Sequence, residues 1–357
     1  MPGRVIDSAA PISTDALVIG AGPVGLFQVF QLGLQEIHCE VVDSLPRPGG
    51  QCVELYGDKP IYDIPGIPVC TGRELSERLL LQIQPFGAGL HVNQDITALD
   101  VMADGSFAVA TSAGKQFHAR SVFIAAGVGA FQPRRLKVDG LDAFEGTQLH
   151  YRVDDATAFA GQHLVVVGGD ATALDWALQF ADGPSRAASV TLVHRRDSLQ
   201  AATGALARLR ALVDAGSLRF MVGQVTGCQS QGGRLTHAEL TGPDGAPQLL
   251  PLDQLLVFQG LSPKLGAIAG WGLAMERKQL VVDPATFQTS VPGIYAVGDI
   301  NTYPGKRKLI LCGFHEATLA AFSAAPLLFP QRDHHLQYTT TSPRLHRLLG
   351  VSHPGID

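Results

Sequence analysis

The sequence predicts an α/β fold with two domains, each a central parallel sheet with a small antiparallel meander. Three observations support this prediction. An apolar strand turns on glycine into a predicted helix at residues 16–25, and the same arrangement recurs at residues 163–173. Strand-forming and helix-forming segments alternate after each turn, which is typical of parallel βαβ units. Such a turn aims backbone N–H groups at a pyrophosphate, so both domains are predicted to be dinucleotide-binding, or Rossmann-like.

The first glycine turn has the spacing expected of a nucleotide site. Strand 16–20 leads into a predicted helix over about 24–34, and the next strand, 37–42, ends at Asp43. A carboxylate at that point accepts hydrogen bonds from ribose hydroxyls. Strand, spacing and acid together favour nucleotide binding over a turn that serves only packing. The glycines expected to approach the phosphates are Gly20, Gly22 and Gly25.

The rest of the first copy reads as a long loop, a helix and a group of short strands. The helix is predicted at about 73–84, and an Asp104-Gly105 turn joins two of the strands that follow. An apolar run at 121–127 closes this copy. The short strands are expected at 96–102, 106–111 and 116–118.

The second copy repeats this plan from strand 164–167 onward. Two strands and two helices alternate before a second set of short strands and a closing apolar run. The expected elements are helix 173–180, strand 189–193, helix 199–213, short strands 219–225 and 236–240, and the run 255–260.

One more strand, 289–299, ends in Gly298-Asp299 and does not begin a third copy. We interpret it as a return to the first domain, where the Asp299 carboxylate is placed to hydrogen-bond the ribityl hydroxyls of a flavin. The first domain is then discontinuous, and two parallel linkers form a natural hinge. The predicted domains are residues 1–128 with 291–357, and residues 129–290.

Basic residues follow the second nucleotide strand at the point where an NAD site carries an acid. Strand 189–193 ends in His194, Arg195 and Arg196. Forked guanidinium donors pair well with phosphate oxygens, so these residues favour the 2′-phosphate of NADP(H) over a merely solvated turn.

The second glycine turn departs from the expected pattern at one position. Gly168, Gly169 and Thr172 are the residues expected to contact the nucleotide, but Asp170 stands where the second motif glycine belongs. A side chain there crowds the pyrophosphate and its carboxylate repels it. Either Asp170 rotates outward and Gly169 takes over, or the nicotinamide nucleotide binds weakly.

Composition excludes several classes of function. The chain has 357 residues, of which 46% are apolar and 17% charged, so disorder is not expected. A net charge of −5 without a basic stripe argues against nucleic acid as the main partner. No uninterrupted apolar run approaches the roughly 20 residues that span a bilayer, and the opening residues lack a secretory core. We therefore expect a cytoplasmic protein that does not enter a membrane.

The cysteines form no local dithiol pair. None lies near the second nucleotide helix, and a pair beginning at Cys52 would need its second member at position 57, which is Gly57. Redox work is therefore expected to stay on a flavin, with buried free thiols as the preferred interpretation of all five cysteines. These are Cys39, Cys52, Cys70, Cys228 and Cys312.

Several separated motifs occur in the order found in one family of flavoenzymes. They are Gly49-Gly50-Gln51, the segment 129–134, the segment 173–178, the segment 194–197, Trp271-Gly272-Leu273 and the segment 298–310. On these residues the chain resembles the thioredoxin-reductase-like ferredoxin(flavodoxin)–NADP+ reductases, which are homodimeric FAD enzymes without a redox disulfide. The resemblance covers nearly the whole chain.

The resemblance implies roles for individual residues. Asp43 would hold the adenosine ribose, and Ile96 would line the adenine end. Gln51 would approach the flavin ring, and Asp299 would hold the ribityl chain. The remaining implied contacts are Tyr56 stacked on one flavin face, Phe131 at the domain junction, Tyr338 over the other face, and Thr340 as a hydroxyl contact whose register within Thr339–Thr341 is open.

The implied activity is an electron relay that needs no side-chain nucleophile, because the cofactors supply the chemistry. NADPH would reduce FAD, which would pass electrons singly to a ferredoxin or flavodoxin-like carrier. Two alternatives stay open. One is an NAD(P)H oxidase or disulfide-reductase-like flavoenzyme with another acceptor. The other is a flavin-binding carrier or sensor with an impaired nicotinamide site. Candidates for steering an acidic partner are Lys306, Arg307, Lys308, Arg134, Arg135 and Lys137.

Overall fold

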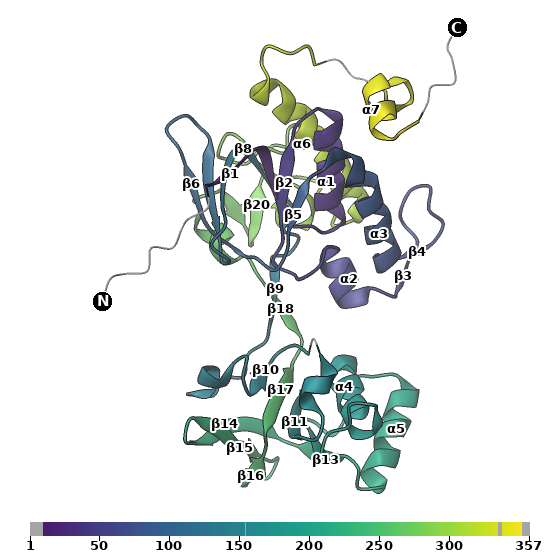
Figure 1. Ribbon diagram of the computed structural model, residues 1–357, viewed down its shortest axis with the longest axis vertical. Coiled ribbons are helices and arrows are strands. Elements are labelled where there is room, and N and C mark those ends of the chain that lie inside the picture. Colours follow the sequence, from purple (N-terminus) through teal and green to yellow (C-terminus); the bar gives the residue numbers. More distant parts are fainter. Residues whose placement is uncertain (1–9, 154, 335–337, 352–357) are drawn as a thin grey trace. The chain divides into compact units, whose positions relative to one another are not determined.

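The structure is a computed structural model that describes residues 10–153, 155–334 and 338–351 (Figure 1). Within these residues the chain forms two compact units. The first is built from the chain up to Phe131 and from Pro263 onward, and the second is Gln132–Ser262. Each unit has its own parallel sheet and its own antiparallel strands, so the predicted α/β fold class is confirmed.

The sheet of the first unit has seven strands in the order β5-β2-β1-β8-β7-β6, with β21 also paired to β8. Neighbours β5, β2, β1, β8 and β21 run parallel, whereas β6, β7 and β8 form the antiparallel meander. Its strands are β1 (Ile12–Ile19), β2 (Cys39–Val42), β5 (Gly89–His91), β6 (Ile96–Val101), β7 (Phe107–Thr111), β8 (Gln116–Ile124) and β21 (Ile294–Ala296).

Helices of the first unit pack against this sheet and against one another. Helix α1 (Pro23–Leu34) contacts both α3 (Gly72–Ile83) and α6 (Ile310–Leu328). A capping box starts α3, where the Thr71 side chain and the Glu74 side chain each bind the other's backbone N–H. The shorter helices are α2 (Gly50–Tyr56), which falls in the predicted long loop, and α7 (Pro343–Leu348).

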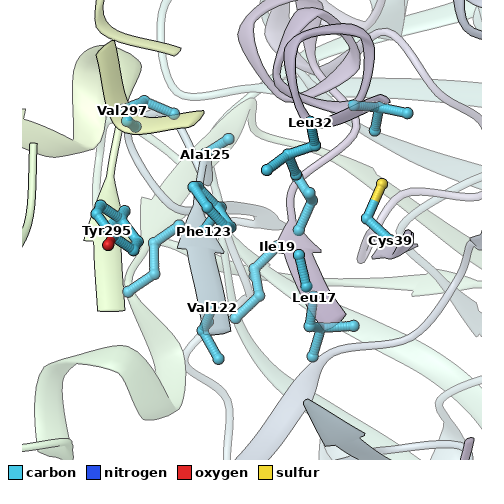
Figure 2. Close-up of a cluster of buried hydrophobic side chains, with 14 of the residues drawn as sticks. Leu17, Ile19, Leu32, Cys39, Val122, Phe123, Ala125, Tyr295 and Val297 are labelled. Carbon is cyan, nitrogen blue, oxygen red and sulfur yellow. The ribbon is translucent and has the colours of Figure 1, made fainter. Parts of the chain in front are cut away.

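Strands far apart in sequence meet in the core of the first unit (Figure 2). Phe123 of β8 stacks on Tyr295 of β21 with ring centroids 4.8 Å apart, and both side chains are fully buried. Leu17 and Val122 are also fully buried, on the paired strands β1 and β8. This packing brings the 294–296 strand into the first sheet, as expected for a chain that returns to its first domain.

The second unit differs from the predicted domain at its C-terminal boundary, which lies at Ser262 rather than at residue 290. Leu273 and Leu280 are buried in the core of the first unit together with Phe287. Strand β20 of this segment pairs in parallel with β22, which lies beyond residue 290 and therefore in the first domain. These strands are β19 (Met275–Glu276), β20 (Gln279–Val281) and β22 (Asn301–Thr302).

The second unit carries a five-stranded parallel sheet in the order β10-β17-β11-β12-β13 and a separate meander, β14-β15-β16. Its helices are α4 (Ala171–Asp182) and α5 (Thr203–Asp214). The sheet strands are β10 (Leu149–His150), β11 (His163–Gly168), β12 (Ser189–His194), β13 (Arg219–Val222) and β17 (Gln254–Phe258). The meander strands are β14 (Gln224–Gln231), β15 (Arg234–Thr241) and β16 (Pro247–Pro251).

Two strands at the boundaries of the units pair with each other as a two-stranded sheet, β9 (Ala130–Pro133) and β18 (Leu261–Lys264). Gly129 precedes β9 with a φ of 104°, and a Cβ at this position would lie 2.4 Å from the Lys264 carbonyl oxygen. Only glycine fits there. The remaining elements are β3 (Pro60–Ile61), β4 (Cys70–Thr71) and the 3-10 helices η1 (Gln84–Phe86), η2 (Leu141–Phe144), η3 (Ala156–Phe159), η4 (Gly266–Gly270), η5 (Gly298–Ile300) and η6 (Thr339–Thr341).

By length and composition alone, α6 would be able to cross a membrane, and it is the one such helix among the described residues. In this fold it is a core helix. One face of α6 is lined by alanines that are fully buried, namely Ala317, Ala320, Ala321 and Ala324. It also carries Glu316, which is buried and hydrogen-bonded to other parts of the first unit.

Candidate functional site

The first glycine turn packs so tightly that two of its glycines have no room for a side chain. A Cβ on Gly20 would lie 2.5 Å from the Ala125 carbonyl oxygen, and a Cβ on Gly25 would lie 1.9 Å from that of Gly20. Gly22 is different, because its added Cβ would meet only the Gly50 Cα, 3.8 Å away. Gly22 is the N-cap of α1 and provides no side-chain cap, so the helix N-terminus stays open to an anion.

Asp43 ties this turn to the end of β2. Its Oδ2 accepts a hydrogen bond from the Ala21 N–H at 2.5 Å, and its Oδ1 accepts one from Leu45 at 2.7 Å. Burial raises the pKa of the Asp43 carboxyl, and the two N–H donors oppose that rise. The residue predicted to hold a ribose therefore also holds the glycine turn in place.

Two segments distant in sequence, the start of α2 and the Gly298–Asp299 turn, meet at the N-terminus of α1. A Cβ on Gly50, at the start of α2, would lie 2.9 Å from the Gly22 Cα. A Cβ on Gly298 would lie 3.4 Å from Val24, in the first turn of α1. The Gln51 Nε2 donates to the Asp299 Oδ2 at 3.1 Å, which joins α2 to η5. Gln51 and Asp299, both predicted as site residues, thus lie together beside the predicted phosphate turn.

Tyr56 ends α2 and is half-buried. Its hydroxyl lies 3.2 Å from the Cys52 Sγ one helical turn earlier. Burial, followed by the contact with Cys52, raises the pKa of Tyr56, so the phenol stays protonated at neutral pH. Its ring is neutral and anchored to the helix that also carries Gln51.

A buried acid that no sequence motif identifies supports the Gly298–Asp299 turn. Glu316 of α6 is fully buried and accepts hydrogen bonds from the Gly298 N–H at 2.7 Å and from the Asn301 Nδ2 at 2.8 Å. The Tyr303 hydroxyl donates to it at 3.0 Å, and Lys306 forms an ion pair with it. The sequence signal for Glu316 is that it is the one carboxylate in an apolar, alanine-rich helix. A charge that such a helix buries needs hydrogen-bonding or charged partners within the fold.

The expectation that Lys306 steers an acidic partner is wrong. Its side chain is only 7% exposed, and its Nζ binds both Glu316 and the Gly298 carbonyl oxygen. The attraction of the buried carboxylate draws the ammonium inward. Arg307 and Lys308, the next two residues, are exposed and keep the surface positions expected of them.

The other residues predicted to contact the flavin lie on β6, on β9 and in the C-terminal segment. Ile96 opens β6 and packs, half-buried, against the core of the first unit. Phe131 belongs to β9, but its side chain lies outside the described part of the structure. Tyr338 and Thr340 are exposed. The C-terminal segment that carries them is bound through Arg344, whose Nη1 donates to the Gly33 carbonyl oxygen at 2.8 Å near the C-terminal end of α1.

In the second unit, His194 lies against the glycine turn. A Cβ on Gly169 would lie 2.1 Å from the Cε1 atom of the His194 ring, so Gly169 makes room for this ring. Burial, with Arg195 and Arg196 contributing, lowers the pKa of His194. Both arginines are exposed at the end of β12.

The remaining residues of this turn have different surroundings. Gly168 is required by packing, since its Cβ would lie 2.2 Å from the Phe258 carbonyl oxygen. Thr172 is exposed in the first turn of α4. Asp170 is the N-cap of α4, and its Oδ1 accepts a hydrogen bond from the Ala173 N–H at 3.1 Å. Its carboxylate therefore lies at the helix N-terminus and does not rotate outward.

All five cysteines are free. Cys39, Cys52 and Cys70 are buried, and burial raises the pKa of Cys39 to about 12. Burial is also the first cause of the raised pKa of Cys52. These thiols have the surroundings of unreactive core residues.

Comparison with known proteins places the chain among flavin-type reductases. Residues 14–318 match a family described as pyridine nucleotide-disulphide oxidoreductase. The chain belongs to this family. A protein of Methylibium petroleiphilum named ferredoxin–NADP reductase is 61% identical over 97% of this chain and 95% of its own. A Polaromonas protein of the same name is 60% identical, with 99% of this chain and 98% of its own covered.

Solved structures show the same fold at low sequence identity. Thioredoxin reductase of Lactococcus lactis matches 89% of this chain and 99% of its own, with a TM-score of 0.57 and 22% identity. Bacillithiol disulfide reductase of Staphylococcus aureus covers 90% of this chain and 100% of its own, with a TM-score of 0.58 and 16% identity. The predicted resemblance to thioredoxin-reductase-like ferredoxin–NADP+ reductases is confirmed by these relatives together.

Proposed function

We propose that this protein is a ferredoxin–NADP+ reductase that transfers electrons between NADPH and a small one-electron carrier, ferredoxin or flavodoxin, through FAD. One observation carries the proposal. The open N-terminus of α1 lies beside Gly50 and the Gly298–Asp299 turn, and the Ala21 N–H just before it donates a hydrogen bond to Asp43. This arrangement occurs in a chain that is 61% identical to a protein named ferredoxin–NADP reductase.

The first unit fits FAD by the chemistry of its residues. Gly22 leaves the helix N-terminus of α1 accessible, and that terminus stabilises a pyrophosphate. Asp43 suits a ribose, while Gln51 and Asp299 suit the polar atoms of the flavin and its ribityl chain. Bound flavin supplies hydride acceptance and single-electron release. The full set that we assign to FAD is Gly20, Gly22, Gly25, Asp43, Gln51, Ile96, Phe131, Asp299 and Thr340, with Tyr56 and Tyr338 stacked on the ring.

The second unit is assigned to NADP(H). The exposed Arg195 and Arg196 offer forked donors to the 2′-phosphate, which NADH lacks. The neutral His194 ring adds a flat surface beside the turn. The set that we assign to NADP(H) is Gly168, Gly169, Thr172, His194, Arg195 and Arg196.

We further propose a cytoplasmic homodimer that associates with neither membranes nor nucleic acid. The exposed Tyr338 and Thr340 are available to a second subunit, and Arg307 and Lys308 present positive charge to an acidic carrier. Sedimentation of the purified protein should give twice the chain mass, and a single-chain mass would contradict the dimer.

A second candidate function is favoured by one observation. Asp170 caps the helix to which the nicotinamide nucleotide would bind, which suits a flavin-binding carrier with an impaired nucleotide site. An oxidase is the other alternative, and steady peroxide production would favour it. A disulfide reductase lacks support, because no cysteine lies near the second nucleotide helix and Gly57 stands where a partner of Cys52 would be needed.

Steady-state electron transfer distinguishes these functions. Flavin-loaded protein should reduce ferredoxin, or a viologen dye, with NADPH as donor. Replacing both arginines, Arg195→Ser with Arg196→Ser, should raise KM for NADPH by about tenfold to a hundredfold, since each removes charge-assisted hydrogen bonds. Activity with NADH should not change. Arg210→Ser, on an exposed arginine of α5 in the same unit, is the matched control. Absence of turnover with both nucleotides would rule out the reductase.

A further inference from the structure

The two glycine turns of this chain follow the same plan but end differently at the helix N-cap. Gly22 is the N-cap of α1 and offers no side chain to the helix. Asp170 is the N-cap of α4, and its carboxylate accepts a hydrogen bond from the Ala173 N–H at 3.1 Å. The first turn thus serves as an internal reference for what an open turn looks like in this protein.

The Asp170 carboxylate takes the position in which a helix N-terminus stabilises an anion. N–H groups in the first turn of a helix lack intrahelical partners, and an aspartate cap accepts a hydrogen bond from one of them. The negative charge of the aspartate is also attracted to the positive end of the helix dipole, as the charge of a bound anion would be. The half-buried side chain is held in a turn whose backbone is itself fixed, because the Gln200 N–H donates to the Gly169 carbonyl oxygen at 2.8 Å. A pyrophosphate would have to displace this carboxylate or lie beside it.

We propose that Asp170 competes from within the chain with the pyrophosphate of the nicotinamide nucleotide and so sets its affinity. The proposal rests on the proposed use of NADP(H) and concerns the strength of that binding. Asp170 is therefore a residue that tunes affinity, and its substitution should tighten binding where most changes in a nucleotide site weaken it.

The pattern across nucleotides distinguishes this role from that of the basic residues. NADP+ and NAD+ carry the same pyrophosphate, so removing the Asp170 carboxylate should tighten both by the same factor. Arg195 and Arg196 face the 2′-phosphate in the proposed site, so their removal should weaken NADP+ alone. The ratio of the two affinities is then insensitive to residue 170 and sensitive to residues 195 and 196.

Calorimetric titration of the flavin-loaded protein with NADP+ and NAD+ tests this directly, because oxidised nucleotide binds without turnover. Asp170→Asn keeps a capping oxygen and removes the charge, and should tighten both nucleotides by about tenfold. Asp170→Gly restores the motif and should tighten both by at least as much, on the order of tenfold to a thousandfold. Asp244→Asn is the matched control, since the Asp244 carboxylate likewise accepts a backbone N–H, that of Ala246, in the same unit.

The possible outcomes distinguish the competitor role of Asp170 from the proposed reductase function. Equal tightening of NADP+ and NAD+ by both Asp170 variants, with no effect of Asp244→Asn, supports the competitor role. Unchanged or weaker binding in both variants overturns it, and so does an absence of binding in every variant. Failure of NADPH to reduce the flavin would instead contradict the proposed reductase function, whatever the titrations show.

Discussion

Removing the positive charge of Lys306 should destabilise the first unit strongly. Lys306 is the cation paired with Glu316, and the two side chains are 7% and 0% exposed. Removing one partner of a buried ion pair typically costs about 3–5 kcal/mol, because it leaves the other charge uncompensated. Glu316 would retain three neutral donors, from Gly298, Asn301 and Tyr303, so Lys306→Met should cost about 3 kcal/mol, the lower end of this range.

Tryptophan fluorescence can follow this unit alone. The chain has two tryptophans, Trp271 in the first unit and Trp176 in the second. In a Trp176→Phe background, Trp271 therefore reports thermal unfolding of the first unit. A loss of about 3 kcal/mol corresponds to a Tm lower by about 6–12 °C for a unit of this size.

Two further variants make this prediction falsifiable. Lys308→Met removes an exposed lysine two positions away and should change stability by no more than about 0.5 kcal/mol. Adding Glu316→Gln to Lys306→Met removes the uncompensated charge and should recover part of the lost Tm. If Lys306→Met lowers Tm no more than Lys308→Met does, the buried ion pair does not support the Gly298–Asp299 turn as we infer.

Three other outcomes follow from the structure. Gly25→Ala places a Cβ 1.9 Å from the Gly20 carbonyl oxygen and should yield protein with little bound flavin, whereas Gly204→Ala, where a Cβ meets nothing within 4 Å, should keep its flavin absorbance. The lowered pKa of His194 means that the unfolded chain binds more protons than the folded one as the pH falls below 6.5, so the second unit should lose stability with falling pH. In a Trp271→Phe background, denaturation followed by Trp176 fluorescence should show a smaller loss of stability with falling pH in His194→Gln. An identical dependence of stability on pH in the two proteins would contradict this. Iodoacetamide at mildly alkaline pH should leave Cys39, whose pKa is raised to about 12, unlabelled while the partly exposed Cys312 reacts, as mass spectrometry of the native protein would reveal.

Local sequence patterns were sufficient to predict the parallel βαβ frame. Strand 16–20 and helix 24–34 correspond to β1 (Ile12–Ile19) and α1 (Pro23–Leu34), because apolar runs bounded by glycine mark a buried strand and the helix after it. Boundaries were less predictable where strands merge or divide. The segments 116–118 and 121–127 contribute to one long strand, β8, whereas 219–225 divides at Gly223 into β13 and β14.

Features that depend on pairing between distant segments could not be predicted from local pattern. Residues 263–290 belong to the first unit because Leu280 and its neighbours pack in that core and because β20 pairs with β22. The partners of Glu316 lie 10 to 18 positions earlier in the chain and are brought to it by the fold. The sequence marked Asp170 as a departure from the motif, but only the structure shows that its carboxylate caps α4.

The half-reaction between nicotinamide nucleotide and flavin is the most direct test of the central claim. Purified protein should be yellow, and mixing it anaerobically with NADPH in a stopped-flow instrument should bleach the visible flavin band, more efficiently than NADH does at equal concentration. Subsequent addition of oxidised ferredoxin should restore the band. A colourless protein that cannot be reconstituted with FAD, or a flavin band that NADPH leaves unchanged, would contradict the account.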